Sequence, residues 1–135
     1  MRMKANRKDK QKLILEDICP DINQWPESWS GDSDDILPGK KLLSQFKLFI
    51  QAQIDKGRVK ATIRSHSNYL WALGGEVIRD ISNNDDYNQN LMDYELLMKY
   101  VSESGGPYWR DAYDTNDHKK YDSVCRMLYK FMNHV

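Results

Sequence analysis

The chain has 135 residues, of which 40% are hydrophobic and 30% charged, a composition typical of one globular domain with its own core. Twenty basic residues balance twenty acidic ones, so the formal net charge is zero. This balance disfavours nucleic acid as a partner of the whole surface, although a local basic face would still bind it. No apolar run approaches the ~20 residues of a membrane span, and the basic start MRMKANRKDKQK has no signal-peptide core. We therefore expect a cytoplasmic protein without a membrane partner.

The first 39 residues differ in character from the rest. Residues 1–12 hold six bases and one acid, whereas residues 16–39 hold seven acids and no base. The pattern predicts a basic arm, a short helix that Pro20 ends, and then an irregular acidic segment. We accordingly divide the chain into an N-terminal arm and segment, 1–39, and a helical domain, 40–135.

Two indole side chains lie in the acidic segment, in WPESW. Trp25 precedes Pro26, which favours an extended backbone at Trp25. We expect Trp25 and Trp29 to fold back over one end of the helical domain, because each ring buries ~150–250 Å². The alternative is that the two rings form a clamp for a protein partner.

The first long helix is predicted over residues 40–55, KKLLSQFKLFIQAQID. Its apolar residues recur at helical spacing, and Gly57 follows as a stop signal. The apolar positions are Leu42, Leu43, Phe46, Phe49, Ile50 and Ile54.

The second helix is predicted over residues 60–80, KATIRSHSNYLWALGGEVIRD, with Thr62 as the candidate N-cap. Its apolar stripe consists of Ile63, Leu70, Leu73, Val77 and Ile81. Its interior holds Gly74 and Gly75, and a glycine within a helix costs ~1 kcal/mol relative to alanine. We favour one continuous helix whose glycines admit a close neighbour, either another helix or the Trp segment. The alternative is that one glycine ends the helix and a new helix begins at Glu76.

Two further helices are predicted towards the C-terminus. In LMDYELLMKYV, Leu97, Tyr100 and Val101 share a face with Tyr94, and the run 105–107, Gly-Gly-Pro, ends the segment. The last helix runs from about 117 to 134 and has the most regular apolar stripe, with Thr115 or Asn116 as candidate N-cap. The residues of this stripe are Tyr121, Val124, Cys125, Leu128 and Met132.

No segment alternates apolar and polar residues with a period of two, so we predict no β-strand. The sequence therefore predicts an all-α fold, a four-helix bundle with an irregular N-terminal arm.

The sequence lacks the patterns of catalytic and metal-binding sites. The three histidines are widely separated, and Cys19 and Cys125 form no CxxC pair, so we expect no metal, no disulfide and no cofactor. The glycine pairs lack phosphate-loop spacing. Cys125 lies on an apolar stripe as a packed thiol, and Glu76 is interpreted as a paired structural carboxylate. We therefore expect that the protein is not an enzyme.

Polar and basic residues gather at the start of the second helix and along one face of the last. Helix N-termini present free N–H groups, and Arg, Lys, Ser, Thr and Asn are the usual contacts to phosphates and base edges. The candidate duplex-DNA contacts are Arg58, Lys60, Thr62, Arg64, Ser65, His66 and Asn68 on and before the second helix, with Lys119, Arg126 and Lys130 on the last.

Three segments carry a resemblance to a known family. The helix LLSQFKLFIQAQI, the helix opening TIRSHSNYLWAL and the closing YDSVCRMLYKFM together resemble the core-binding domains of tyrosine recombinases, the phage integrases, over about residues 40–134. That resemblance implies a SAM-like four-helix fold that forms half of a clamp on duplex DNA. It places the start of the second helix on phosphates and grooves, with the basic residues of the last helix as counterparts. The recombinase catalytic motifs do not follow in this sequence, so the resemblance implies binding without cutting.

A second resemblance rests on WPESW, LWALGGEVIRD and CRMLYKF, which are similar to a family of small bacterial proteins that brings no activity with it. It implies a stand-alone protein. Our leading hypothesis is thus a non-catalytic DNA-binding protein. The alternative is a protein-interaction module that uses the acidic segment with Trp25 and Trp29.

Overall fold

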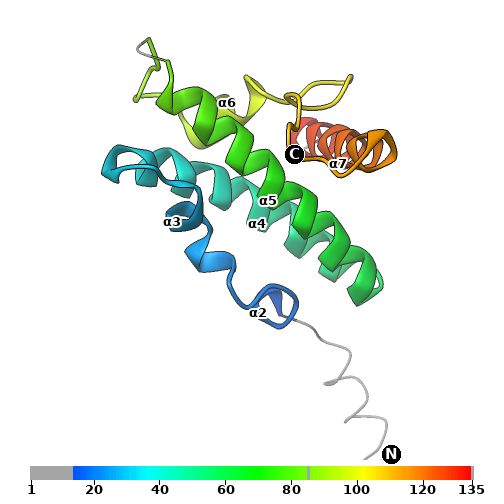
Figure 1. The fold of residues 1–135 in the computed structure, drawn as a ribbon. Helices are drawn as coiled ribbons and strands as arrows, with labels where there is room; N and C mark the ends of the chain where they lie inside the picture. The colour runs from blue at the N-terminus through cyan, green and yellow to red at the C-terminus, as the bar shows by residue number, and fades with distance from the viewer. Residues whose placement is uncertain (1–13, 85, 135) are drawn as a thin grey trace, which may run out of the picture.

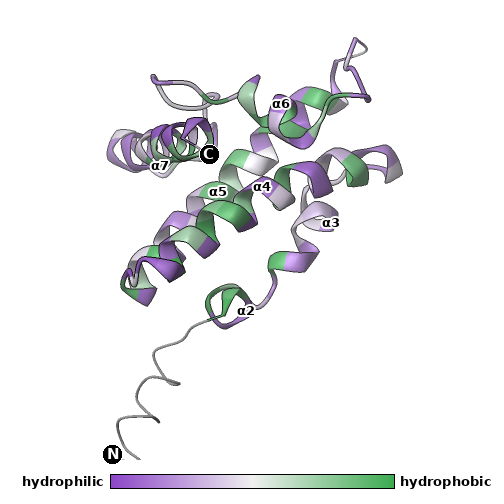
Figure 2. Ribbon diagram, turned by 180° about the vertical axis from the view of Figure 1, so that it is seen from behind, coloured by the Kyte–Doolittle hydropathy of each residue, from purple (hydrophilic) through white to green (hydrophobic). Residues whose placement is uncertain are grey.

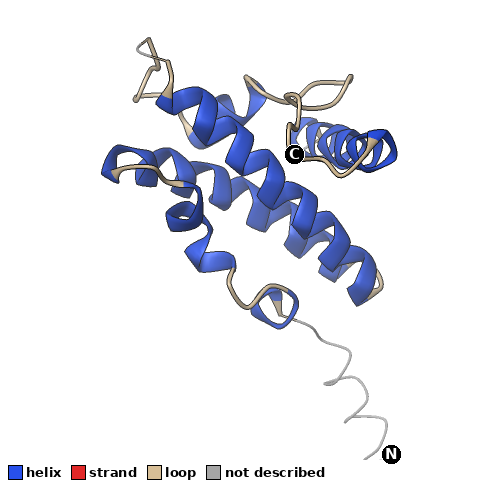
Figure 3. Ribbon diagram, viewed as in Figure 1, coloured by secondary structure: helices blue, strands red, loops and turns tan. Residues whose placement is uncertain are grey.

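The structure is a computed structural model that describes residues 14–84 and 86–134. The predicted basic arm, 1–12, lies outside the described residues. Every regular element in the described ranges is a helix, and one isolated antiparallel bridge joins Ser102 to Gly105 (Figure 3). The prediction of an all-α fold is confirmed.

Two long helices, α4 (Ile36–Asp55) and α5 (Lys60–Ser82), run side by side through the molecule (Figure 1). The prediction that Gly57 stops the first is confirmed, because α4 ends two residues earlier and Gly57 adopts a φ of 77°. However, α4 begins at Ile36. The expected boundary between the N-terminal segment, 1–39, and the helical domain, 40–135, therefore falls within a helix. Pro38 lies in the first turn, where proline removes no helical hydrogen bond.

The helix α5 is continuous through both glycines, as we favoured. The reason lies in α3 (Trp25–Trp29), which packs on α4 and α5. A Cβ on Gly74 would stand 2.5 Å from Cε2 of Trp29, so only glycine admits this indole. The expected fold-back of the two tryptophans is confirmed, since Trp25 is buried and Trp29 packs against the core.

The extended backbone expected at Trp25 is wrong. Trp25 has φ −56° and ψ −47°, which is helical, and it begins α3. Pro26 lies in the first turn of that helix, a position proline favours, and the burial of the Trp25 ring outweighs the steric preference of a residue before proline.

The acidic segment is built of short helical pieces. These pieces are α2 (Leu15–Ile18), a 3₁₀ turn Ile22–Gln24, α3, and a 3₁₀ turn Ser33–Asp35 that leads into α4. They follow the sides of α4 and α5 in Figure 1. The segment is therefore part of the packed structure, and its apolar residues belong to the same core as those of the long helices.

The third predicted helix is shorter than expected. α6 covers only Asp93–Met98, so Tyr100 and Val101 follow it in a turn. Val101 and Leu97 are buried, but Tyr94 is 40% exposed, so the face predicted to include Tyr94 is wrong. Only six residues of the segment are helical because the chain turns towards α5, where the Tyr100 hydroxyl donates to Asp80 at 2.6 Å.

The last helix, α7 (Thr115–Asn133), packs on α5 and α4, and its five predicted core residues are all buried. Its N-cap is Asp114, whose carboxylate accepts the Asp117 N–H at 2.8 Å, so the candidate caps Thr115 and Asn116 are wrong. Much of α7 is hydrophilic in Figure 2, consistent with a single buried stripe.

Both cysteines are buried and free, and burial raises the pKa of the Cys125 thiol to about 12. Cys125 is thus a packed thiol, as predicted. Across the described helices, none combines the length and apolar character needed to cross a membrane.

Candidate functional site

A cleft of about 500 Å³ opens where the turn between α4 and α5 meets the C-terminal half of α7. Its walls come from two stretches that are distant in sequence, residues 49–58 at the end of α4 and in the turn, and residues 127–134 at the end of α7. The lining residues are Phe49, Ala52, Gln53, Lys56, Arg58, Met127, Lys130, Phe131 and His134.

The floor of this cleft is apolar. The rings of Phe49 and Phe131 meet edge to face, with centroids 5.6 Å apart, and Met127 and Ala52 extend the apolar surface. Apolar walls with a few placed polar groups are typical of small-molecule sites.

The rim of the cleft is basic. Lys56 and Arg58 come from the turn, and Lys130 and His134 from the end of α7. The chain carries no acid from 56 to 75, nor from 123 to 135. Part of this charge offsets the negative dipole ends of α4 and α7, which both terminate here. The α5 N-terminus adds a positive dipole end, and its N-cap, Val59, has no side chain that could accept from the free N–H groups there.

Gln53 lines the cleft and forms a polar pair with His66 behind it. Gln53 is only 4% exposed, and its Oε1 is 2.8 Å from Nδ1 of His66. Burial, with a smaller contribution from nearby Arg58, lowers the pKa of His66 below its usual value, so the ring is neutral at pH 7. An amide oxygen only accepts, so Nδ1 carries the proton and donates.

The other end of the Gln53 amide is unsatisfied. Its Nε2 is buried and has no hydrogen-bond partner in residues 14–84 and 86–134. A buried amide donor without a partner costs free energy, so this atom needs an explanation.

The structure separates the predicted DNA contacts into groups. Arg58 and Lys130 meet at the basic cleft, and His66 lies behind its wall. Lys60, Arg64 and Asn68, spaced four apart, follow one another along a different row of α5.

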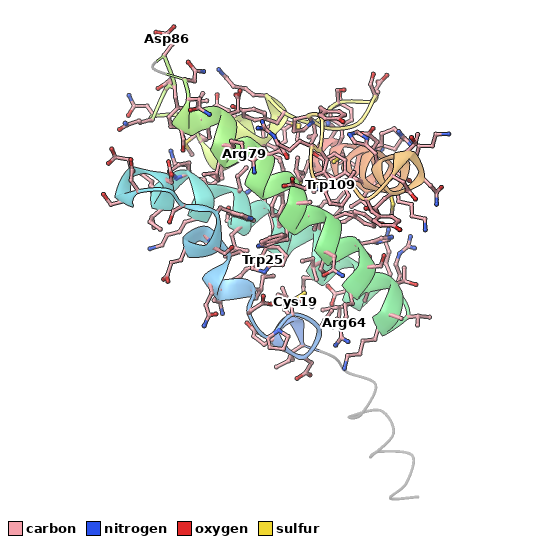
Figure 4. The ribbon with its side chains drawn as sticks, in the orientation of Figure 1. Cys19, Trp25, Arg64, Arg79, Asp86 and Trp109 are labelled. Carbon is pink, nitrogen blue, oxygen red and sulfur yellow. The ribbon has the colours of Figure 1, made fainter. Side chains whose placement is uncertain are left out.

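Arg64 and Asn68 line a second cleft, of about 600 Å³, between α5 and α2. Figure 4 shows Arg64 beside Cys19. The Arg64 Nε donates to the Ile18 carbonyl at 3.4 Å, and Asp21 contributes an opposite charge to the same cleft. Arg64 thus has a structural role here.

The remaining predicted contacts are not brought into the basic cleft. Thr62 and Ser65 are exposed, and Thr62 is not the N-cap, because its N–H donates to the carbonyl of Val59. Lys119 lies about 16 Å from Lys130 along α7, at 1.5 Å per residue, in a small cleft with Asp114. Arg126 is half-buried and does not line the basic cleft.

Sequence reasoning missed Gln53, Lys56, Phe131 and His134. One signal was present for Gln53, which follows Phe46, Phe49 and Ile50 at the next core-facing position of α4 and is therefore a polar residue on an apolar stripe.

A third region holds a buried carboxylate. The Glu76 carboxylate lies 3.6 Å from the Arg110 guanidinium and 3.8 Å from that of Arg79, which is labelled in Figure 4. It also accepts a hydrogen bond from the backbone N–H of Arg110 at 3.3 Å. The interpretation of Glu76 as a paired structural carboxylate is confirmed. In the part of the chain that the structure describes, no three His, Cys, Asp or Glu side chains are grouped to hold a metal ion.

The two tryptophans of the clamp alternative differ in exposure, since Trp29 is only half-buried and lines a cleft with Trp71. Trp25 is buried, and the Trp29 Nε1 donates to the Trp71 carbonyl at 2.9 Å. Both rings therefore serve the fold. The indole left at the surface is Trp71, which is 46% exposed.

Comparisons of the chain with family models, with curated proteins and with solved structures found no match.

Proposed function

We propose that the protein binds duplex DNA without catalysis, through the basic end formed by Lys56, Arg58 and Lys130. The observation that carries the proposal is the convergence of the turn before α5 and the end of α7 on one acid-poor cleft. The recombinase resemblance implies the same two helices as DNA contacts, which supports the choice of nucleic acid.

In this proposal the cations hold phosphates. Lys and Arg side chains release counterions when they neutralise phosphate oxygens, and this gives affinity without reading sequence. The N-terminal N–H groups of α5 add a phosphate contact, and exposed Thr62 and Ser65 stand beside it. With about three cations at this end of a chain whose formal net charge is zero, binding is expected to be modest and strongly salt-dependent.

The test is fluorescence anisotropy of a labelled short duplex against salt concentration. Each neutralised phosphate contributes ~−0.9 to the slope of log affinity on log salt. Arg58→Gln with Lys130→Gln should therefore reduce the slope by about 1.8, in addition to weakening binding at fixed salt.

The matched control is Arg64→Gln with Lys119→Gln, which removes the same charge from positions outside the cleft. It should leave the slope close to that of the wild type. Equal losses in the two double variants, or no binding by the wild type at low salt, would contradict the proposal.

A second candidate is a protein partner on the acidic segment 16–39. The observation that favours it is exposed Trp71, whose Nε1 donates to Ser28 Oγ of that segment at 3.0 Å. In a pull-down, the Trp71→Ala variant should then no longer capture the partner. The Tyr113→Ala variant, which removes another exposed ring far along the chain, should still capture it.

A further inference from the structure

We propose that the basic cleft is a binding site for a small amphipathic anion, a carboxylate or phosphate head on an apolar body. When filled, the cleft would occupy the same cations that hold DNA. The binding site stands on the structure itself, whereas the competition with DNA rests on the proposed function.

The shape and lining of the cleft fit such a ligand. Its volume of about 500 Å³ lies within the range of small-molecule sites, ~300–1,000 Å³. The edge-to-face pair of Phe49 and Phe131, with Met127, offers a surface for an apolar or aromatic body. Methionine adapts to bodies of different shape.

The unsatisfied donor favours an acceptor at the polar end of the ligand. His66 is neutral and is hydrogen-bonded to the Gln53 oxygen, so the atom of the amide left without a partner is the Nε2 donor. A ligand oxygen that accepts from Nε2 would remove the cost of this buried donor. A ligand that carries only donors would not.

The charges around the cleft agree with that preference. Lys56 and Arg58 line the cleft from the turn, Lys130 and His134 line it from the end of α7, and the chain segments that bear them contain no acid. The nearest acid along the chain, Asp55, accepts from Gln51 Nε2 at 3.0 Å on the exposed side of α4. An oxyanion head is therefore favoured over a neutral or cationic one.

A filled cleft would also affect DNA binding. Arg58 and Lys130 belong both to the cleft wall and to the proposed phosphate-binding end. A bound anion would neutralise them, so ligand and DNA should each weaken the affinity for the other by the same factor.

The experiment uses ¹⁵N-labelled full-length protein and three probes of similar size: phenylbutyrate, phenyl phosphate and the neutral phenylbutanol. The proposal expects the Gln53 side-chain NH₂ resonances to shift saturably with the two anions and little with the alcohol. The anion that binds more tightly identifies the head group. Equal binding of the alcohol, or no shift of the Gln53 amide with either anion, would overturn the site.

Variants distinguish the contribution of the Gln53 N–H donor to anion binding from that of the positive charge around the cleft. Gln53→Met removes the donor at similar volume and should weaken anion binding about tenfold while leaving the weak alcohol binding unchanged. Lys130→Gln should weaken the anion likewise, and Lys119→Gln should not. Urea unfolding of each variant confirms that it is folded, and if Gln53→Met unfolds, Lys130→Gln against Lys119→Gln decides the question. Unchanged anion affinity in both Gln53→Met and Lys130→Gln would overturn the proposal.

Competition is measured separately, by adding the tighter anion to the DNA titration. Displacement of DNA by phenylbutyrate or phenyl phosphate, but not by inorganic phosphate at equal ionic strength, supports the link. If the anion binds and DNA never does, the proposed function fails and the ligand site stands. If the anion and DNA bind at the same time without weakening each other, the proposed competition is wrong.

Discussion

The contact of Trp29 with Gly74 shows how one residue determines the position of a whole segment. The indole lies against the helix at the point where a side chain is missing, and its Nε1 donates to the Trp71 carbonyl. A glycine that weakens an isolated helix thus becomes favourable once α3 is docked, because the packing gained exceeds the propensity lost.

Gly74→Ala should destabilise the protein by ~1–3 kcal/mol, since the new methyl group would overlap the Trp29 ring. Gly75→Ala is the matched control, because its Cβ would stand 3.6 Å from Trp29 Cδ1, an ordinary contact. The control should be neutral or stabilising by up to ~1 kcal/mol. Urea unfolding followed by circular dichroism measures both, and equal effects would contradict this account of Trp29.

The sequence predicted that the glycines admit a close neighbour, because both fall beside the apolar stripe of one helix. It did not say which neighbour. Gln53 shows the opposite case: its position on the apolar stripe of α4 was visible, but its partner His66 lies 13 residues on in a different helix. Which side chains of two helices meet depends on how the helices pack against each other. The spacing of residues along one helix does not predict this.

At the scale of elements, helix interiors were easier to predict than helix ends. The stripes of α4, α5 and α7 follow the burial of every third or fourth residue, so their interiors are set locally. The ends depend on single hydrogen bonds. Three consecutive residues around the start of α7, Asp114, Thr115 and Asn116, are all of types that cap helices well, and the backbone makes the first of them the N-cap.

Asp114→Ala should cost ~1 kcal/mol of stability, the usual cost of losing an N-cap side chain. The carboxylate accepts the Asp117 N–H, and its charge suits the positive end of the helix dipole. Asn116→Ala changes a residue inside the first turn and should be neutral within ~0.5 kcal/mol. Thermal unfolding of both variants tests the assignment, and a larger loss for Asn116→Ala would refute it.

At the scale of the whole molecule, buried polar contacts tie the acidic segment to the long helices. Asp35 accepts from the N–H groups of Gly31 and Asp32 and from the Ser82 hydroxyl, 47 residues away at the end of α5. Burial alone would raise the pKa of Asp35, but these three hydrogen bonds hold it below its ordinary value of 3.8.

This contact predicts a pH dependence. Because the folded-state pKa is lowered, the carboxylate contributes its full stability above about pH 4 and loses it as pH falls through the folded value. Asp35→Asn should therefore destabilise by ~1–3 kcal/mol at pH 7, and the difference from wild type should shrink towards acid.

Urea unfolding at neutral pH and near pH 3 measures the effect. Asp34→Asn is the control, since Asp34 is exposed and neighbours Asp35 in the same 3₁₀ turn. It should show no such difference. A stability gap for Asp35→Asn that is constant with pH would contradict the charged hydrogen-bond role.

The basic cleft also belongs to the scale of the whole molecule. Charge counting found a neutral protein, and the two acid-free runs at 56–75 and 123–135 became one surface only through the packing of α7 on α4 and α5. Arg64 and Lys119 carry the same charge as Arg58 and Lys130 but face other parts of the fold.

The sequence by itself determined the all-α class, the buried stripes of the three long helices and the stop at Gly57, and it favoured a close neighbour at the two glycines of α5. Each of these follows from spacing along one helix, where every contact is local. Only the tertiary structure decided that α3 is helical, that Trp29 is that neighbour, and that Arg58 and Lys130 share a cleft over an unsatisfied Gln53. Those features depend on contacts between residues far apart in the chain, and these contacts arise from docking the helices on one another.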